Sequence, residues 1–276
     1  MSFIVILLWI AVLAVAAKTV AWLIQRRSGN AGIVDAIWAW TLGGSALVWA
    51  CAGTGDPFLR GMMAVMGVAW GGRLGWHLWQ RNHGQPEDWR YAQLRARWGR
   101  RADRNMFWFF QFQVLFTLAL SASAFAPVTY ATVSPGPVWI GLALAIWLTA
   151  VLGESVADRQ LRRFRADPRR HGQVCRDGLW RYSRHPNYFF ECLHWCAYVP
   201  LAVGGAGWPW TLAAPVVMAF LLLRLSGVPL LEAEMIRRKP GYADYVRQTN
   251  VLVPWWPRGD SAPRPASGCT DTSQTK

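Results

Sequence analysis

The sequence predicts an all-α membrane protein with about seven transmembrane helices, its N-terminus outside the cell and its C-terminus in the cytoplasm. Of its 276 residues 53% are hydrophobic and only 16% are charged, so the apolar residues must gather in blocks. A bilayer core needs about 20 predominantly apolar residues per helix. Seven blocks approach that length, at about 3–24, 34–52, 58–79, 107–127, 137–154, 186–204 and 208–228.

The placement of the basic residues predicts the orientation. Apart from Lys18 and Arg60, every Lys and Arg lies between the first two blocks, around the connections after the third and fifth blocks, or from Arg224 onward. The positive-inside rule places these segments in the cytoplasm, which suits a bacterial inner membrane. The net charge of +14 therefore indicates topology, with anionic lipids or a phosphate-bearing cofactor as further partners, and no nucleic acid is expected.

The two ends of the chain have different characters. The first block has no basic stretch ahead of it, and Arg26 and Arg27 follow it, which favours a retained helix over a signal peptide. The segment 258–276 is rich in Ser, Thr, Pro and Gly and is predicted to be disordered. Residues 1–257 are predicted to form a single membrane-embedded domain.

The five cysteines predict neither a disulfide framework nor a metal site. They form no CxxC pair. Cys192 and Cys196 share a helical face, but His194 points away from it, so this segment does not supply a tetrahedral zinc site.

The densest motif is 178–191, at the entry to the sixth block. Pro186 suits the first turn of a helix, so Asn187 and Glu191 lie one turn apart on one face at membrane depth, where polar groups must face the protein interior or a wet cavity. Three basic residues stand at the positive end of this helix and favour a cofactor-phosphate site: Arg181, Arg184 and His185. The alternative is an interfacial anchor in which Glu191 pairs with an arginine.

Two further motifs carry acids together with arginines. Asp158, Arg162 and Arg165 fall at helical spacings, so one face carries a carboxylate and two guanidiniums, which suits phosphate binding or a solvated basic loop. The segment 81–91 follows Arg73 and His77 in the third block. It contains an acid pair, Glu87 and Asp88, flanked by Arg90 and Tyr91. These residues could bind a ribose or an adenine edge. They could equally form a structural ion-pair latch.

The remaining acids near the membrane are Asp35, Glu232 and Glu234. Asp35 begins the second block, where it is either a functional acid or a helix cap. Glu232 and Glu234 lie just beyond the last block, at the negative end of a helix, and therefore need cations from the basic segments.

The order of these motifs resembles the steroid 5-alpha-reductase-like membrane enzymes, specifically their bacterial branch labelled DUF1295. The resemblance covers most of residues 34–257, and its most specific parts are 87–91, 157–165, 178–191 and 242–254. The run 184–188 alone is also similar to isoprenylcysteine and phospholipid methyltransferases.

The resemblance implies a seven-helix enzyme that holds NADPH on the cytosolic side and passes hydride to a conjugated carbon–carbon double bond of a lipid-soluble substrate. It implies that Asp158, Arg165 and Asn187 contact the dinucleotide. Arg162, Arg181, Tyr182 and Tyr188 would lie nearby. The steroid-reducing members carry a Gln-Glu pair in helix 2 and a Tyr in helix 3, whereas that part of helix 2 here has only Asp35 and Trp38, so steroid specificity is not implied.

We predict a site at the cytoplasmic face. The candidates for polarising a substrate oxygen are Tyr188, Glu191 and Asp35. The candidates for contacting NADPH are Arg73, Glu87, Asp88, Arg90, Tyr91, Asp158, Arg162, Arg165, Arg181, Tyr182, Arg184, His185 and Asn187.

Two other functions are considered. The first is methyl transfer from S-adenosylmethionine to a lipid or prenylcysteine, with Glu232 and Glu234 facing the methionine ammonium. S-adenosylmethionine is cationic and NADPH carries three phosphates, so the arginine density favours the reductase. The second is a lipid-binding scaffold, and polar residues at membrane depth argue against it because a scaffold has no need of them.

Overall fold

The computed structural model describes residues 1–259, and within that range the protein is built of helices without strands, as the sequence predicts. The predicted disordered tail, 258–276, lies almost entirely outside the described residues. The α-helices are α1 (Phe3–Ser28), α2 (Ile33–Ala52), α3 (Pro57–Asn82), α4 (Trp89–Trp98), α5 (Ala102–Thr129), α6 (Pro137–Ala166), α7 (Pro186–Cys196), α8 (Tyr198–Ala202), α9 (Ala213–Phe220), α10 (Val228–Arg238) and α11 (Tyr242–Gln248).

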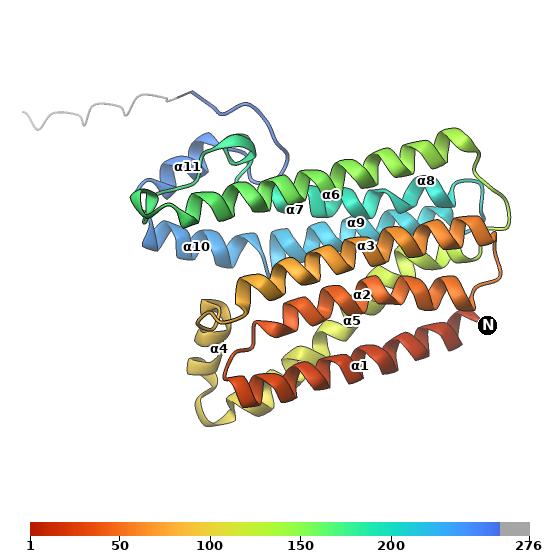
Figure 1. Ribbon diagram of the computed structural model, residues 1–276, viewed down its shortest axis with the longest axis horizontal. Helices are drawn as coiled ribbons and strands as arrows, with labels where there is room; N and C mark the ends of the chain where they lie inside the picture. The colour runs from red at the N-terminus through yellow and green to blue at the C-terminus, as the bar shows by residue number, and fades with distance from the viewer. Residues whose placement is uncertain (260–276) are drawn as a thin grey trace, which may run out of the picture.

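Five helical stretches are long and apolar enough to cross a membrane: Phe3–Ser28, Ile33–Ala52, Trp89–Thr129, Pro137–Ala166 and Trp208–Arg238. Their outward side chains are apolar, with Leu8 60% and Leu152 62% exposed, which suits contact with lipid. The protein is therefore a multi-pass membrane protein. The predicted count of seven also includes α3, which runs beside α2, and α7 with α8, which runs beside α6 (Figure 1). That count and the orientation stay predictions.

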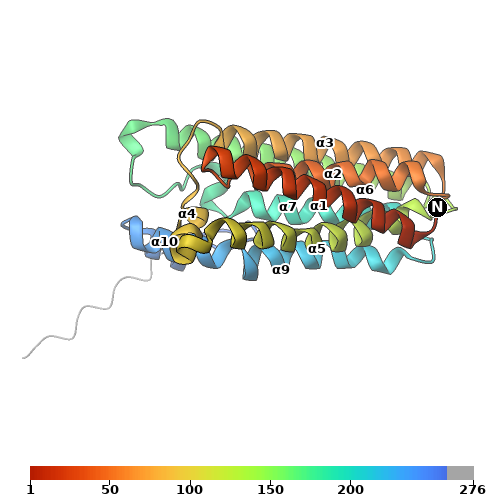
Figure 2. The same cartoon turned by 90° about the horizontal axis from the view of Figure 1, so that it is seen from below.

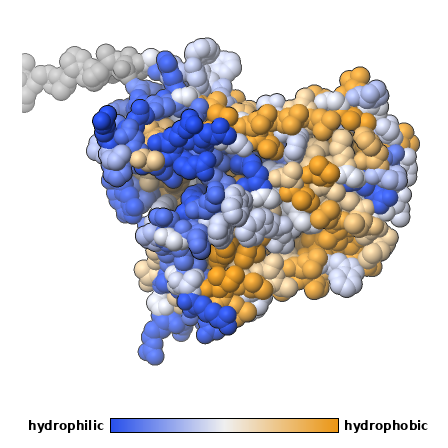
Figure 3. Space-filling view, in the orientation of Figure 1, coloured by the Kyte–Doolittle hydropathy of each residue, from blue (hydrophilic) through white to orange (hydrophobic). Residues whose placement is uncertain are grey.

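The long helices lie side by side in an elongated bundle, and Figure 2 shows the same bundle turned by a quarter turn. The short helices α4, α10 and α11 gather at the end opposite the N-terminus (Figure 1). Hydrophilic residues concentrate at this end, and most of the apolar residues on the visible face lie over the rest of the bundle (Figure 3). We call this region, which comprises residues 81–101, 159–185 and 232–258, the polar end.

Close packing of α2 against α3 depends on glycine. A Cβ atom at Gly43 would lie 2.7 Å from the carbonyl oxygen of Gly67 and 2.8 Å from the Cα of Gly71. Only glycine allows the two backbones to approach in this way, as at many helix contacts in membranes. A neighbouring face of α3 carries Trp70, Arg73 and His77, at helical spacings of three and four.

Several helices differ from the predicted blocks. Helix α6 continues to Ala166, well beyond the predicted end at 154, so the motif with Asp158 is helical as its spacing predicts. The predicted helix 186–204 is interrupted at Ala197, between α7 and α8. The predicted helix 208–228 starts as a 3₁₀ turn and ends in a π turn over Leu221–Leu225, and Glu232 and Glu234 then lie inside α10.

Candidate functional site

A buried ion-paired cluster, which we call the Arg73 centre, lies between α3, α6 and α7. Its members are Trp70, Arg73, His77, Glu154, Asp158 and Glu191. The Nη2 atom of Arg73 lies 2.5 Å from Glu154 Oε2, and its Nη1 donates to Asp158 Oδ2 at 3.1 Å. His77 Nε2 lies 3.6 Å from the same Asp158 oxygen. The two carboxyl-bearing residues are only 4% and 7% exposed, so one guanidinium serves two acids where an unpaired charge would be costly.

Glu191 completes the Arg73 centre without an arginine in direct contact. Its Oε2 accepts the indole N–H of Trp70 at 2.9 Å, and its Oε1 accepts that of Trp195 at 3.0 Å. The residue is 6% exposed. The anchor alternative paired Glu191 with a nearby arginine of the same motif, whereas the structure gives it two indoles in the interior.

A second group, which we call the Asp35 cluster, joins α2 to the start of α4; it comprises Asp35, Arg81, Asp88, Arg90 and Tyr91. Asp35 accepts the Tyr91 hydroxyl at 2.5 Å and an N–H of Arg90 at 3.1 Å. Arg90 also donates to Asp88, and Arg81 lies 3.6 Å from that acid. The N-cap residue of α2 is Gly32, and Asp35 makes no side-chain cap, so the helix-cap alternative for Asp35 is wrong.

Glu87, next to the Asp35 cluster, also has structural partners. Its carboxylate accepts from Arg95 at 2.9 Å and from the backbone N–H of Ala31 at 2.9 Å. These bonds tie the residues before α4 to the turn before α2. These contacts are those that the ion-pair-latch hypothesis for the motif 81–91 predicts, and contact with a ribose or an adenine edge stays a prediction.

The cations at the entry to α7 are held by α10. Arg184 Nε donates to Glu232 at 2.7 Å, and His185 Nε2 lies 2.9 Å from the same oxygen. Arg184 also donates to the backbone carbonyl of Val246 at 2.9 Å. The predicted need of Glu232 for cations is met here, and Glu234 contacts Arg237 and Arg238 within α10.

Tyr188 lies where the motif-bearing segments meet. Its ring stacks on that of His185, with the ring centroids 5.2 Å apart. Its phenol interacts electrostatically with the Asp35 cluster. Arg165 of α6 lies within electrostatic range of the same cluster, where Asp88 attracts it and Arg81 repels it. Residues from α2, α3, α4, α6 and α7 therefore converge at one place on the polar end.

Some of the predicted cofactor residues have no ionic partner. Within residues 1–259, Arg162, Arg165 and Arg181 make no side-chain hydrogen bond and no ion pair; Arg181 lies 6.0 Å from the ring of Tyr182. Asn187 Oδ1 is a buried oxygen without a hydrogen-bond partner. These arginines and this amide are free to meet a ligand, whereas Arg73, Arg90 and Arg184 are engaged by acids.

Sequence reasoning missed several buried polar residues. Glu154 was taken only as the end of an apolar block, although an acid at membrane depth is itself an indication of function. Lys18 is the one charged residue in the first block, and its Nζ donates to Gln113 at 2.8 Å. Trp70 and His194 carry no distinguishing pattern in the sequence.

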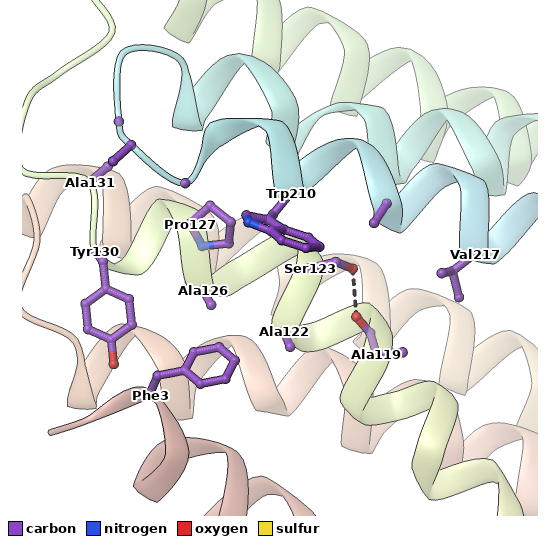
Figure 4. Close-up of a pocket in the computed structure, with 14 residues that line it drawn as sticks. Phe3, Ala119, Ala122, Ser123, Ala126, Pro127, Tyr130, Ala131, Trp210 and Val217 are labelled. Carbon is purple, nitrogen blue, oxygen red and sulfur yellow. Dashed lines mark hydrogen bonds between the residues drawn. The ribbon is translucent and has the colours of Figure 1, made fainter.

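An apolar pocket of about 600 Å³ lies near the N-terminus, away from the polar end. Figure 4 shows its walls, to which Phe3, Tyr130 and Trp210 contribute from different segments. Its two lining hydroxyls are already engaged: that of Ser123 donates to the carbonyl of Ala119 at 2.7 Å (Figure 4), and that of Tyr130 donates to the carbonyl of Met1 at 3.1 Å. None of the predicted site residues lines this pocket.

Fold and site together define a multi-pass, all-helical membrane protein in which acids, arginines and aromatic residues converge near one end of the bundle. The chain belongs to the family described as protein of unknown function DUF1295, whose model matches residues 21–249. This confirms the predicted DUF1295 membership, and the relation to steroid 5-alpha-reductase-like enzymes stays a prediction. No curated protein and no solved structure matches the chain.

Proposed function

We propose that this protein is a membrane-embedded, NADPH-dependent reductase that transfers hydride to a conjugated carbon–carbon double bond of a lipid-soluble substrate. The observation that carries the proposal is that Arg162, Arg165 and Arg181 make no side-chain hydrogen bond and no ion pair within residues 1–259, and that the buried oxygen of Asn187 has no partner. In this proposal the polar end faces the cytoplasm of a bacterium, where the dinucleotide is available.

The chemistry of these residues fits a dinucleotide. Guanidinium groups bind phosphate through a planar fork of donors, and NADPH carries three phosphates. Arginines that are not engaged by acids can take up those phosphates without breaking an existing ion pair. The Asn187 oxygen is an acceptor that suits a ribose hydroxyl or a carboxamide N–H. NADPH would supply the hydride there.

The residues that already have ion-pair partners within the protein have a positioning role in the proposal. Arg184 and His185, held by Glu232, fix the start of α7 and with it Tyr188. The Asp35 cluster forms the facing wall. When a conjugated ketone accepts hydride at its β carbon, negative charge builds on its oxygen, and a positioned donor lowers the barrier. Tyr188 is the candidate donor with a hydroxyl that is not committed to an acid.

The methyltransferase alternative is less well supported. It assigns Glu232 and Glu234 to the ammonium of S-adenosylmethionine. Glu232 already contacts Arg184 and His185, and Glu234 already contacts Arg237 and Arg238. A cationic ligand would have to displace them.

Ligand binding to the detergent-purified protein tests the proposal. We expect saturable NADPH binding, weaker NADH binding and no S-adenosylmethionine binding in calorimetry. Arg165→Ala and Asn187→Ala should each weaken NADPH binding, Arg165→Ala by about tenfold or more because a charge-assisted hydrogen bond contributes about 1.5–3 kcal/mol. Arg247→Ala, in an exposed pair with Asp244, is the control. Saturable S-adenosylmethionine binding without NADPH binding would contradict the proposal.

A further inference from the structure

Four polar side chains lie on one face of α7 and its continuation into α8. They are Asn187, Glu191, His194 and Tyr198, spaced four, three and four residues apart. The Tyr198 hydroxyl lies 3.2 Å from His194 Nε2, and the His194 ring stacks on Trp70 at a centroid distance of 4.6 Å. His194 and Tyr198 are both fully buried. The face thus leads from the polar end into the interior along the Arg73 centre.

The charges of the Arg73 centre do not balance if every acid is ionised. Within the described residues, the carboxyl groups of Glu154, Asp158 and Glu191 lie around one arginine, Arg73, that contacts two of them directly. The charge of Arg165 acts on Asp158, and those of Arg81 and Arg162 act on His77, without an ion-pair contact. His77 adds a positive charge only when protonated. Burying one ion costs several kcal/mol even after relaxation, and like charges in a shared site do not all ionise. At least one of the three acids must therefore keep its proton.

The hydrogen bonds indicate which acid keeps it. Both oxygens of Glu191 accept indole N–H groups, which suits an ionised carboxylate because it is an acceptor only. Asp158 accepts from Arg73 and faces His77. Within residues 1–259, Glu154 has a single ion-pair partner, Arg73, whose Nη2 lies 2.5 Å from its Oε2, and it shares that guanidinium with Asp158. Glu154 is therefore the acid that is best left neutral.

A second observation indicates that small hydrogen-bonding ligands can occupy this region. In the described part of the chain, five buried polar atoms of the Arg73 centre and of the α7 face have no hydrogen-bond partner: Arg73 Nε and Nη2, Glu154 Oε2, Asn187 Oδ1 and His194 Nδ1. Buried polar atoms in folded proteins are almost always satisfied, by ordered water if not by protein. The side chain of His77, at the outer edge of the centre, is 22% exposed. Water can therefore connect the centre to the polar end.

We propose that Glu154 is a neutral carboxylic acid at neutral pH and that the Arg73 centre holds the proton consumed in alkene reduction. The use of the proton rests on the proposed reductase function; the protonation of Glu154 does not. The substrate β carbon accepts hydride with its electron pair, and the π electrons move to the carbonyl oxygen. The α carbon then takes a proton from the Glu154 carboxyl, by way of water. Glu154 becomes a carboxylate beside Arg73 and regains a proton from water through His77 and Asp158.

Infrared difference spectroscopy on the full-length protein in detergent tests the protonation directly. We expect the C=O stretching band of a protonated carboxyl at neutral pH, with a shift on exchange into heavy water. Glu154→Gln should remove this band. The exposed-acid variant Asp244→Asn should keep it. Retention of the whole band in Glu154→Gln, or its absence from the wild type, would overturn the proposal.

A second variant keeps the test decisive if Glu154→Gln does not fold. Asp158→Asn removes one of the like charges, so the carboxyl band should vanish at lower pH than in the wild type; an unchanged pH profile would overturn the proposal. In turnover, Glu154→Gln should lower kcat about 100-fold or more without changing NADPH affinity, as expected for loss of a proton donor. A Glu154-dependent band in a protein that does not bind NADPH would support the protonation and refute the reductase function.

Discussion

Tyr91 donates its hydroxyl to Asp35 at 2.5 Å, and this bond joins the start of α4 to the first turn of α2. Arg90 donates to the same carboxylate at 3.1 Å. Tyr91 is 4% exposed, so solvent water cannot readily replace Asp35 as the hydrogen-bond partner of its hydroxyl. The contact therefore fixes α4 against the membrane-embedded part of the protein.

Asp35→Asn should destabilise the protein. The amide cannot neutralise Arg90, and it offers one acceptor oxygen where the carboxylate offers two. We expect the free energy of unfolding in detergent to fall by about 1–3 kcal/mol, the usual cost of leaving buried polar groups unsatisfied. Circular dichroism on heating measures it. Asp244→Asn breaks an exposed pair and should have little effect; equal losses in the two variants would show that the contact is not structural.

Gly71→Ala should separate α2 from α3. A Cβ at Gly71 would lie 2.7 Å from the carbonyl oxygen of Ala39 and 2.7 Å from the Cα of Gly43, both of them backbone atoms that cannot turn away. We expect a loss of about 1–3 kcal/mol in unfolding free energy, as for overpacked cores. Gly72→Ala is the matched control because a Cβ there meets nothing within 4 Å. A stable Gly71→Ala variant would contradict this packing.

Asp88 should make stability depend on acid pH. Burial opposes ionisation of its carboxyl, but hydrogen bonds and charge from Arg90, with the charge of Arg81, outweigh burial and hold the pKa of Asp88 below its usual value. Because the folded pKa is lower, ionised Asp88 stabilises the fold above the unfolded pKa of about 4, and this stabilisation is lost as pH falls through the folded pKa. The wild-type unfolding midpoint should fall with acidification below about pH 4, and that of Asp88→Asn should fall less. Parallel profiles would exclude this role.

Cysteine labelling tests the orientation. Arg100 lies at the polar end just after α4, and Ser134 lies in the connection between α5 and α6. In a variant without the five native cysteines, an impermeant thiol reagent should label Ser134→Cys on intact cells and Arg100→Cys only after lysis. Labelling of both from the same side would contradict the positive-inside prediction.

The long helices could be predicted because apolar blocks of membrane length can be recognised from local composition alone. The interruption at Ala197 was missed although its signal is local, because Pro200 has no backbone N–H to donate to the carbonyl of Cys196. The π turn over Leu221–Leu225 has no such recognised signal. The candidate site likewise has one part that local spacing predicts and another part that depends on the packing of helices. The spacing of Asp158 and Arg165 showed a shared face, but the partner of Glu154 is Arg73 on another helix, a contact that only the packing of α3 against α6 creates.

The central claim is hydride transfer from NADPH, and isotope transfer tests it most directly. The purified protein in lipid nanodiscs would be incubated with a conjugated lipid enone and NADPH deuterated at the hydride-donating carbon, and the lipid analysed by mass spectrometry. The reductase function predicts a product with its double bond saturated and one deuterium retained on carbon, formed more slowly by Arg165→Ala. An enone that is recovered unreduced, or a saturated product without deuterium on carbon, would contradict it.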